Sequence, residues 1–222
     1  PVSVPFQGPV LITGGGISGF AAARELARKG MESLIFSPAQ TPDQVLAELP
    51  RTFPGSRIFS GELTELLREV FASPLIKVLT DLPVEYVVGH VGDYRLGMRQ
   101  PDGTVTEVTG SALILALDRE FVPGDYDYIG GGEKVCDLLE MEERLAQGEI
   151  EAGKVVFWVN SPEHGKAAQE FASVAAWRNS LVLAREHPGV KPTVLYPANI
   201  TLPLTGGDLA EARQFGIGLQ SY

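Results

Sequence analysis

The stretch that decides the fold is residues 9–38, PVLITGGGISGFAAARELARKGMESLIFSP. It opens with a short apolar run at residues 10–13, which predicts a buried strand because it is too short for a helix. Residues 20–29 then place apolar side chains every three to four positions, which predicts a helix. A second apolar run, residues 34–36, predicts a parallel partner strand. The stretch therefore reads as a strand–helix–strand unit.

Three glycines between the first strand and the helix follow the spacing G-x-G-x-x-G. In such a turn Gly14 allows the sharp bend, Gly16 lets a pyrophosphate approach the backbone, and Gly19 lets the helix lie close to the strand. The N–H groups of the helix N-terminus then face the phosphates. The alternative, a glycine-rich turn without a ligand, stays open. The candidate binding residues are Gly14, Gly15, Gly16, Ile17, Ser18 and Gly19.

The end of the second strand lacks the acidic residue that usually accepts hydrogen bonds from a ribose. Ser37 stands at that position and Pro38 follows it. A serine hydroxyl can still bond a ribose hydroxyl, but more weakly than a carboxylate. No arginine follows this strand to meet a 2′-phosphate, so the pattern indicates FAD or NAD and disfavours NADP.

Composition excludes several classes of protein. The 222 residues carry 18 Lys and Arg against 28 Asp and Glu, a net charge of −10, which argues against nucleic acid or an anionic membrane as the main partner. No apolar stretch approaches the roughly 20 residues of a membrane span, and no signal-peptide pattern opens the chain. Cys136 is the only cysteine, which fits a reducing cytoplasm and a small buried side chain. Because the chain begins with proline, we expect a fragment or a processed piece.

The rest of the chain alternates helices and strands. Helices are predicted at residues 43–48, 60–72, 135–147, 166–186 and 208–215. Strands are predicted at residues 76–79, 84–88, 94–100, 104–108, 111–117, 155–159, 193–196 and 217–220. The sequence Pro101-Asp102-Gly103 predicts a hairpin turn, and the apolar residues 111–117 predict a strand covered on both faces. The glycine cluster at residues 126–132 reads as a loop, with a ligand loop as the alternative.

The order of elements predicts an α/β fold. We expect an FAD/NAD(P)-binding, Rossmann-like parallel sheet with helices on both faces and an inserted antiparallel β-meander. Residues 1–150 would form the dinucleotide-binding domain with the meander. Residues 151–222 would form a second α/β segment packed on the same core, with a further C-terminal part expected.

No catalytic constellation is visible in the sequence. The three histidines lie far apart and form no metal-ligand pair: His90, His164 and His187. The carboxylates of Glu140, Glu142 and Glu143 are expected to form a solvated helix face, and Trp158 and Trp177 are expected in the core. A bound cofactor would therefore carry any chemistry.

Four segments together resemble the A subunit of heterodisulfide reductase, a family of FAD-binding electron-transfer proteins. They are GGGISGFAAARELARKG at residues 14–30, residues 60–100, which are similar to the segment leading to the family's second flavin strand, VVFWVNS at residues 155–161, and the stretch from residue 194 to the last residue. The resemblance implies flavin-mediated electron transfer inside a larger redox complex whose other subunits are the partners. It also implies that the backbone of Val84 meets the adenine and that Ala116 lines the flavin.

The chain departs from that family at three places. Ser37 replaces the ribose-binding acid, and Ala116-Leu117-Asp118 replaces an A-T-G flavin motif. Ala172, with Ala175 or Ala176, stands where the family has cysteines, so this chain alone would ligate no iron–sulfur cluster. Two alternatives follow: a non-catalytic scaffold that kept the fold and lost the flavin, and an NAD(P)-binding domain.

Overall fold

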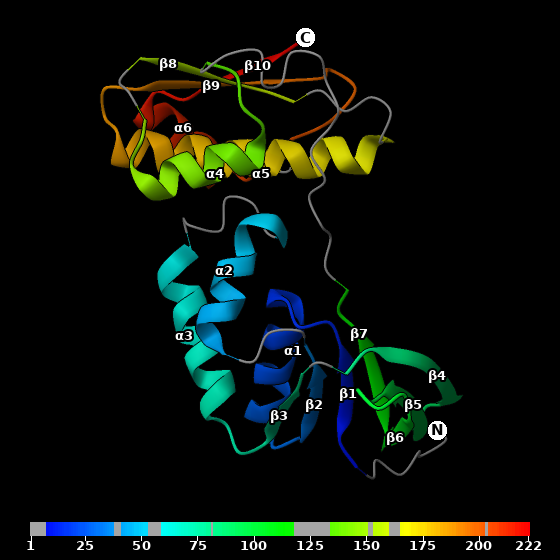
Figure 1. The fold of residues 1–222 in the computed structure, drawn as a ribbon. Coiled ribbons are helices and arrows are strands. Elements are labelled where there is room, and N and C mark those ends of the chain that lie inside the picture. Colours follow the sequence, from blue (N-terminus) through cyan, green and yellow to red (C-terminus); the bar gives the residue numbers. More distant parts are fainter. Residues whose placement is uncertain are drawn as a thin grey trace. The chain divides into compact units, whose positions relative to one another are not determined.

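The computed structural model describes residues 8–37, 41–52, 59–80, 82–117, 134–150, 153–159, 165–202 and 204–222. The chain divides into two compact units (Figure 1). The first comprises Pro1–Leu49 and Ser60–Arg119, and the second comprises Pro50–Phe59 and Glu120–Tyr222. None of the described helices is long and apolar enough to cross a membrane.

The first unit holds a parallel sheet, an antiparallel sheet and three helices. Its elements are β1 (Val10–Thr13), α1 (Ile17–Arg28), β2 (Ser33–Phe36), α2 (Pro42–Thr52), α3 (Ser60–Ala72), β3 (Ile76–Leu79), β4 (Val84–His90), β5 (Asp93–Arg99), β6 (Val105–Gly110) and β7 (Ala112–Leu115).

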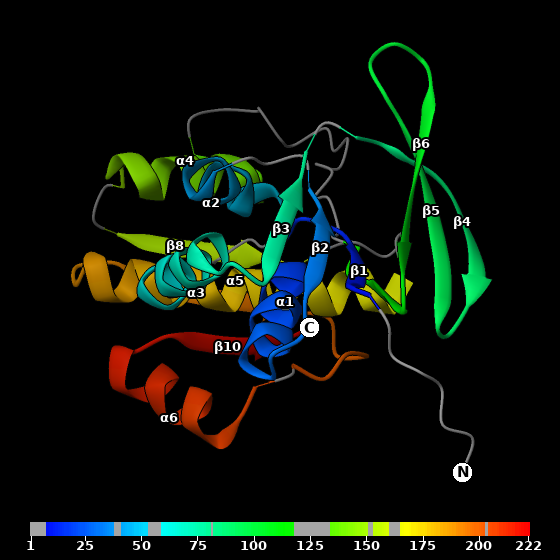
Figure 2. The ribbon, with the colours of Figure 1, turned by 90° about the horizontal axis from the view of Figure 1, so that it is seen from below.

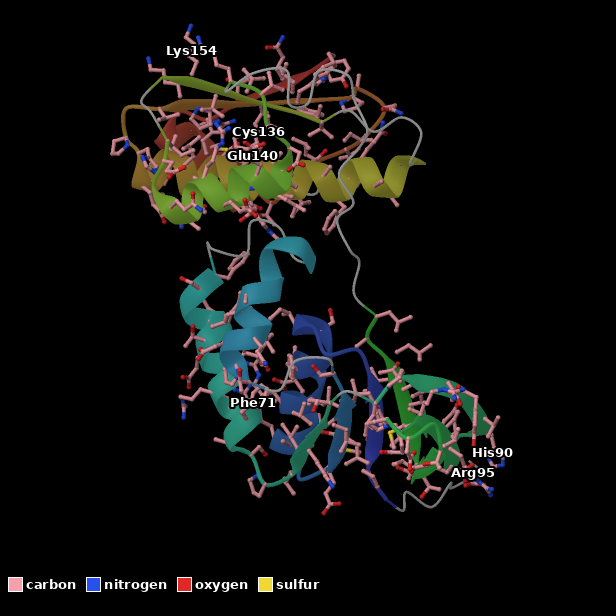
Figure 3. The ribbon with its side chains drawn as sticks, in the orientation of Figure 1. Phe71, His90, Arg95, Cys136, Glu140 and Lys154 are labelled. Carbon is pink, nitrogen blue, oxygen red and sulfur yellow. The ribbon has the colours of Figure 1, made fainter. Side chains whose placement is uncertain are left out.

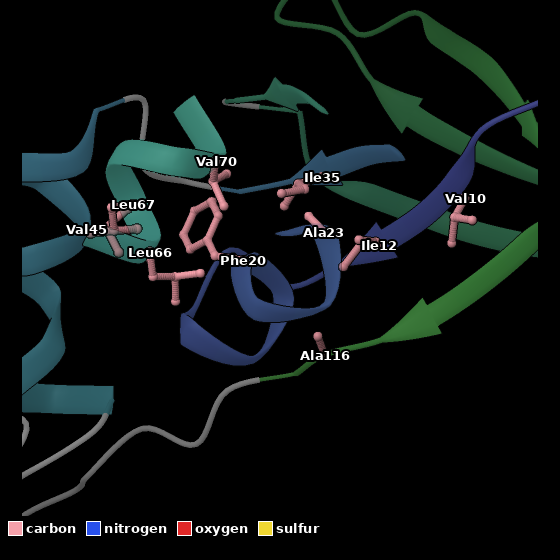
Figure 4. Close-up of a cluster of buried hydrophobic side chains, with 10 residues drawn as sticks. All are labelled: Val10, Ile12, Phe20, Ala23, Ile35, Val45, Leu66, Leu67, Val70 and Ala116. Atoms are coloured by element: carbon pink, nitrogen blue, oxygen red, sulfur yellow. The ribbon is translucent and has the colours of Figure 1, made fainter. Parts of the chain in front are cut away.

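The parallel sheet has the strand order β3-β2-β1-β7, so β1 lies inside it. Val10 pairs with Ser33 on one side and with Ala112 on the other. One face of this sheet packs against the helices, and Phe20 of α1 and Leu67 of α3 are completely buried there. Figure 4 shows this cluster gathered around Phe20. The predicted strand–helix–strand unit is confirmed.

The other face of the parallel sheet is covered by the meander β4-β5-β6. Leu11 and Phe36 of the parallel sheet form one buried cluster with Leu96 and Met98 of β5. Figure 2 shows these three antiparallel strands beside the parallel sheet. The predicted fold class is confirmed, with one correction: the meander, rather than a second layer of helices, covers this face, because β5 supplies the apolar side chains that it needs.

The prediction that residues 111–117 form a strand covered on both faces is wrong at its carboxyl end. Within the described residues β7 pairs only with β1 and is an edge strand of the sheet. The side chains of Leu115 and Leu117 are 65% and 73% exposed. An apolar run alone cannot distinguish a central strand from an edge strand, since both can be built from the same residues.

The second unit is a three-stranded parallel sheet with helices on one face (Figure 1). Its strand order is β10-β9-β8. The observed division puts α4 in this second unit, and the domain boundary expected at residue 150 stays a prediction. The elements are α4 (Leu138–Gln147), β8 (Lys154–Trp158), α5 (Gly165–Glu186), β9 (Lys191–Tyr196), α6 (Gly206–Phe215) and β10 (Gly218–Ser221).

Two predictions about single side chains of this unit are wrong. Glu142, expected on a solvated helix face, is only 5% exposed, whereas Trp158, expected in the core, is 53% exposed. Trp177 is buried as predicted. Trp158 points outward because it alternates with Phe157, which packs against the helices, and successive strand side chains face opposite sides.

Gly97 of β5 provides a test of the meander. The ring of Tyr86 lies across Gly97, and its hydroxyl donates to Glu107 Oε2 at 3.2 Å on the far strand. A Cβ at residue 97 would lie 2.2 Å from the Tyr86 ring. We expect Gly97→Ala to displace this ring and lower the free energy of unfolding by about 1–3 kcal/mol, measured by urea denaturation.

Gly61→Ala is the matched control for that change. Gly61 lies in α3 and nothing lies within 4 Å of its Cβ position. There the same substitution should stabilise the protein by up to about 1 kcal/mol, because alanine favours the helix. Equal effects of the two substitutions would contradict the described packing of Tyr86.

Candidate functional site

The carboxyl end of β1 lies where the strand order of the sheet reverses. From β1 the chain moves to β2 and β3 on one side, while β7 joins β1 on the other. In open α/β sheets such a reversal leaves a crevice outside the carboxyl ends of the strands, where ligands bind. The predicted glycine loop occupies this place, between Thr13 at the end of β1 and Ile17 at the start of α1.

Gly14 is required by the packing of the chain against itself. Its φ angle is +122°, a conformation that other residues rarely adopt. A Cβ at this position would lie 1.8 Å from the carbonyl oxygen of Ala116. The structure therefore brings Gly14 and Ala116, both predicted site residues, into direct contact.

Gly19 is required by the approach of α1 to the loop. A Cβ at Gly19 would lie 2.1 Å from the carbonyl oxygen of Gly14. The helix can therefore start directly above the end of β1 only if residue 19 has no side chain. The prediction that Gly19 lets helix and strand lie close together is in this respect confirmed.

Gly16 differs from the other two glycines of the motif. It is the N-cap of α1, with φ −91° and ψ −174°, angles that any residue can adopt. Glycine has no side chain to accept a hydrogen bond from the helix, and Ser, Asp or Asn would cap the helix slightly better. Neither the backbone conformation nor the capping role of residue 16 therefore calls for glycine.

The N-terminus of α1 presents unpaired backbone donors. The first intrahelical hydrogen bond runs from Phe20 N–H to the Gly16 carbonyl at 3.1 Å. The N–H groups of residues 16–19 precede it and have no acceptor within the helix. The first turn of α1 contains no acidic residue. The positive end of the helix dipole is therefore not neutralised by its own side chains, an arrangement that favours a bound anion.

Ser37 lies against the loop, as its place at the end of β2 predicts. It is buried, and its backbone N–H donates to Leu79 at 2.9 Å. A Cβ at Gly15 would lie 2.0 Å from the Ser37 hydroxyl oxygen. Gly15 therefore makes room for Ser37, a reason that sequence spacing could not supply because the contact joins two different strand ends.

Thr13 is a candidate site residue that the sequence analysis missed. It is 8% exposed, and its hydroxyl has no hydrogen-bond partner within the described part of the chain. Buried polar atoms without a partner are rare and call for an explanation. This one lies directly before the glycine loop. The only sequence signal is a polar residue closing an otherwise apolar strand.

For the remaining predicted residues the structure shows no contact with the glycine loop among the described residues. Val84 starts β4 and packs in the cluster between the parallel sheet and the meander. Its contact with adenine stays a prediction. Pro38, Asp118, His164 and the glycine cluster at residues 126–132 lie outside the described residues.

The alanines at the positions where the resembled family has cysteines pack in the hydrophobic core of the second unit. Ala176 is buried in its largest apolar cluster and Ala172 packs against that cluster. Cys136 also packs there, and burial raises the pKa of its thiol. Among the described residues no group of three or more His, Cys, Asp or Glu side chains could hold a metal ion.

Comparison with curated proteins confirms the resemblance seen in the sequence. A protein of Archaeoglobus profundus, named for its likeness to the A subunit of heterodisulfide reductase, is 35% identical over 91 residues, which are 41% of this chain and 13% of that protein. One of the CoB–CoM heterodisulfide reductase iron-sulfur A subunits of Methanopyrus kandleri is 29% identical over 126 residues, 56% of this chain and 19% of that protein. The chain thus spans less than a fifth of these relatives. No family model matches it.

Comparison with solved structures supports the fold. Thioredoxin reductase of T. acidophilum superposes with a TM-score of 0.50 at 17% identity, over 98% of this chain and 64% of that enzyme. At this identity the likeness concerns the fold alone. Together with the strand order and the glycine loop, it establishes a Rossmann-like α/β fold of the kind that this thioredoxin reductase has.

Gly14→Ala tests the contact on which the loop depends. The new Cβ would meet the backbone of Ala116, which cannot move aside as a side chain can, and residue 14 would be strained at positive φ. We expect a loss of more than about 3 kcal/mol in the free energy of unfolding, measured by urea denaturation. Gly206→Ala, with nothing within 4 Å of its Cβ position, is the control and should change stability little. A stable Gly14→Ala protein would contradict this geometry.

Proposed function

We propose that this chain is an FAD-dependent electron-transfer component similar to the A subunit of heterodisulfide reductase. It would work in the cytoplasm as part of a multi-subunit redox complex, with the other subunits of that complex as partners. The curated relatives carry the names of such subunits. The proposal includes no iron–sulfur cluster ligated by this chain alone.

The observation that carries the proposal is the conformation of Gly16. Gly14, Gly15 and Gly19 are each explained by a contact inside the chain. Gly16 has ordinary backbone angles, and Ser, Asp or Asn would cap its helix slightly better, so the helix itself does not require glycine there. We infer that residue 16 is glycine so that a phosphate group can approach the backbone.

The charge of the loop suits a pyrophosphate. Its negative charges would lie at the N-terminus of α1, where the N–H groups of Ile17, Ser18 and Gly19 have no acceptor in the helix. Because the first turn carries no acid, no carboxylate of the helix itself would repel the phosphates there.

The neighbouring residues would orient the rest of the cofactor. Ser37 would accept from or donate to the adenosine ribose, Val84 would meet the adenine through its backbone, and Ala116 and Pro38 would line the site. Thr13 would direct its hydroxyl to the cofactor or to a water held with it, which would give that buried group a partner. Bound flavin would supply the electron transfer itself.

The first experiment is the visible absorbance of the purified protein, followed by titration of colourless protein with FAD. A flavin spectrum, or saturable binding with a change in flavin fluorescence, is the expected result. A folded sample that shows no colour and takes up no FAD would refute the proposal and favour the scaffold alternative. Repeating the FAD titration in the presence of excess NAD distinguishes the two dinucleotides, because NAD weakens the apparent FAD affinity only if it binds at the same site.

Gly16→Asp separates cofactor binding from folding. Aspartate is a good N-cap, so the stability of α1 should be kept, but its carboxylate would repel the pyrophosphate. We expect FAD affinity to fall at least about a hundredfold while the melting temperature of the cofactor-free protein stays the same. Gly61→Asp, the same change in the exposed first turn of α3, should leave FAD affinity unchanged. Unchanged affinity in Gly16→Asp would refute the loop assignment.

Ser37→Glu tests the place of the ribose. A carboxylate accepts a hydroxyl proton more strongly than serine does, so restoring the acid should tighten FAD binding by about tenfold. Ser60→Glu, at the exposed start of α3, is the control for the added charge. Weaker binding in Ser37→Glu, measured by the same fluorescence titration, would show that Ser37 does not face the ribose.

A further inference from the structure

We draw no further inference here: the strongest candidate, the outward face of the meander in the first unit, where the side chains of Tyr86, Val88 and Val105 are exposed beside Arg95 (Figure 3), carries no proposal because nothing in the described part of the structure shows what covers it.

Discussion

The packing of backbone on backbone at the end of β1 is the constraint on which the first unit depends. The carbonyl of Ala116 lies where a side chain of Gly14 would be, and the carbonyl of Gly14 lies where a side chain of Gly19 would be. These two contacts lock β7, the loop and α1 together, because no rotamer change can relieve a clash with backbone. They also set the direction of α1, whose first N–H groups have no acceptor within the helix and lie beyond the carboxyl ends of the strands.

The glycines of the loop differ in whether a contact within the chain explains them. Gly14, Gly15 and Gly19 make room for contacts within the chain, whereas the backbone angles of Gly16 are open to any residue. A sequence motif cannot make this distinction, since all four positions carry the same letter. The buried hydroxyl of Thr13 has no hydrogen-bond partner in the described part of the chain, which lowers the stability of the isolated protein. A ligand that bonded this hydroxyl would offset that loss.

The two units share a strand order but differ in how their sheets are covered. The meander of the first unit buries the face opposite its helices. Its outward side combines two polar pairs, Arg99 with Glu85 and Tyr86 with Glu107, with the exposed side chains of Val88 and Val105. The corresponding face of the second unit carries Trp158 and a pair of lysines. Among the described residues, the two parallel sheets thus differ in what covers the face opposite their helices.

The sequence by itself determined the order of helices and strands, the strand–helix–strand unit at residues 10–36 and the meander turn, because apolar periodicity and glycine spacing are local properties. Only the tertiary structure decided that a meander covers one sheet face, that Leu115 and Trp158 are exposed and Glu142 buried, and that Gly15 makes room for Ser37. Each of these depends on which segment becomes the neighbour of another. Periodicity indicates on which face of a helix or strand a side chain lies. Packing between distant segments decides whether that face is covered.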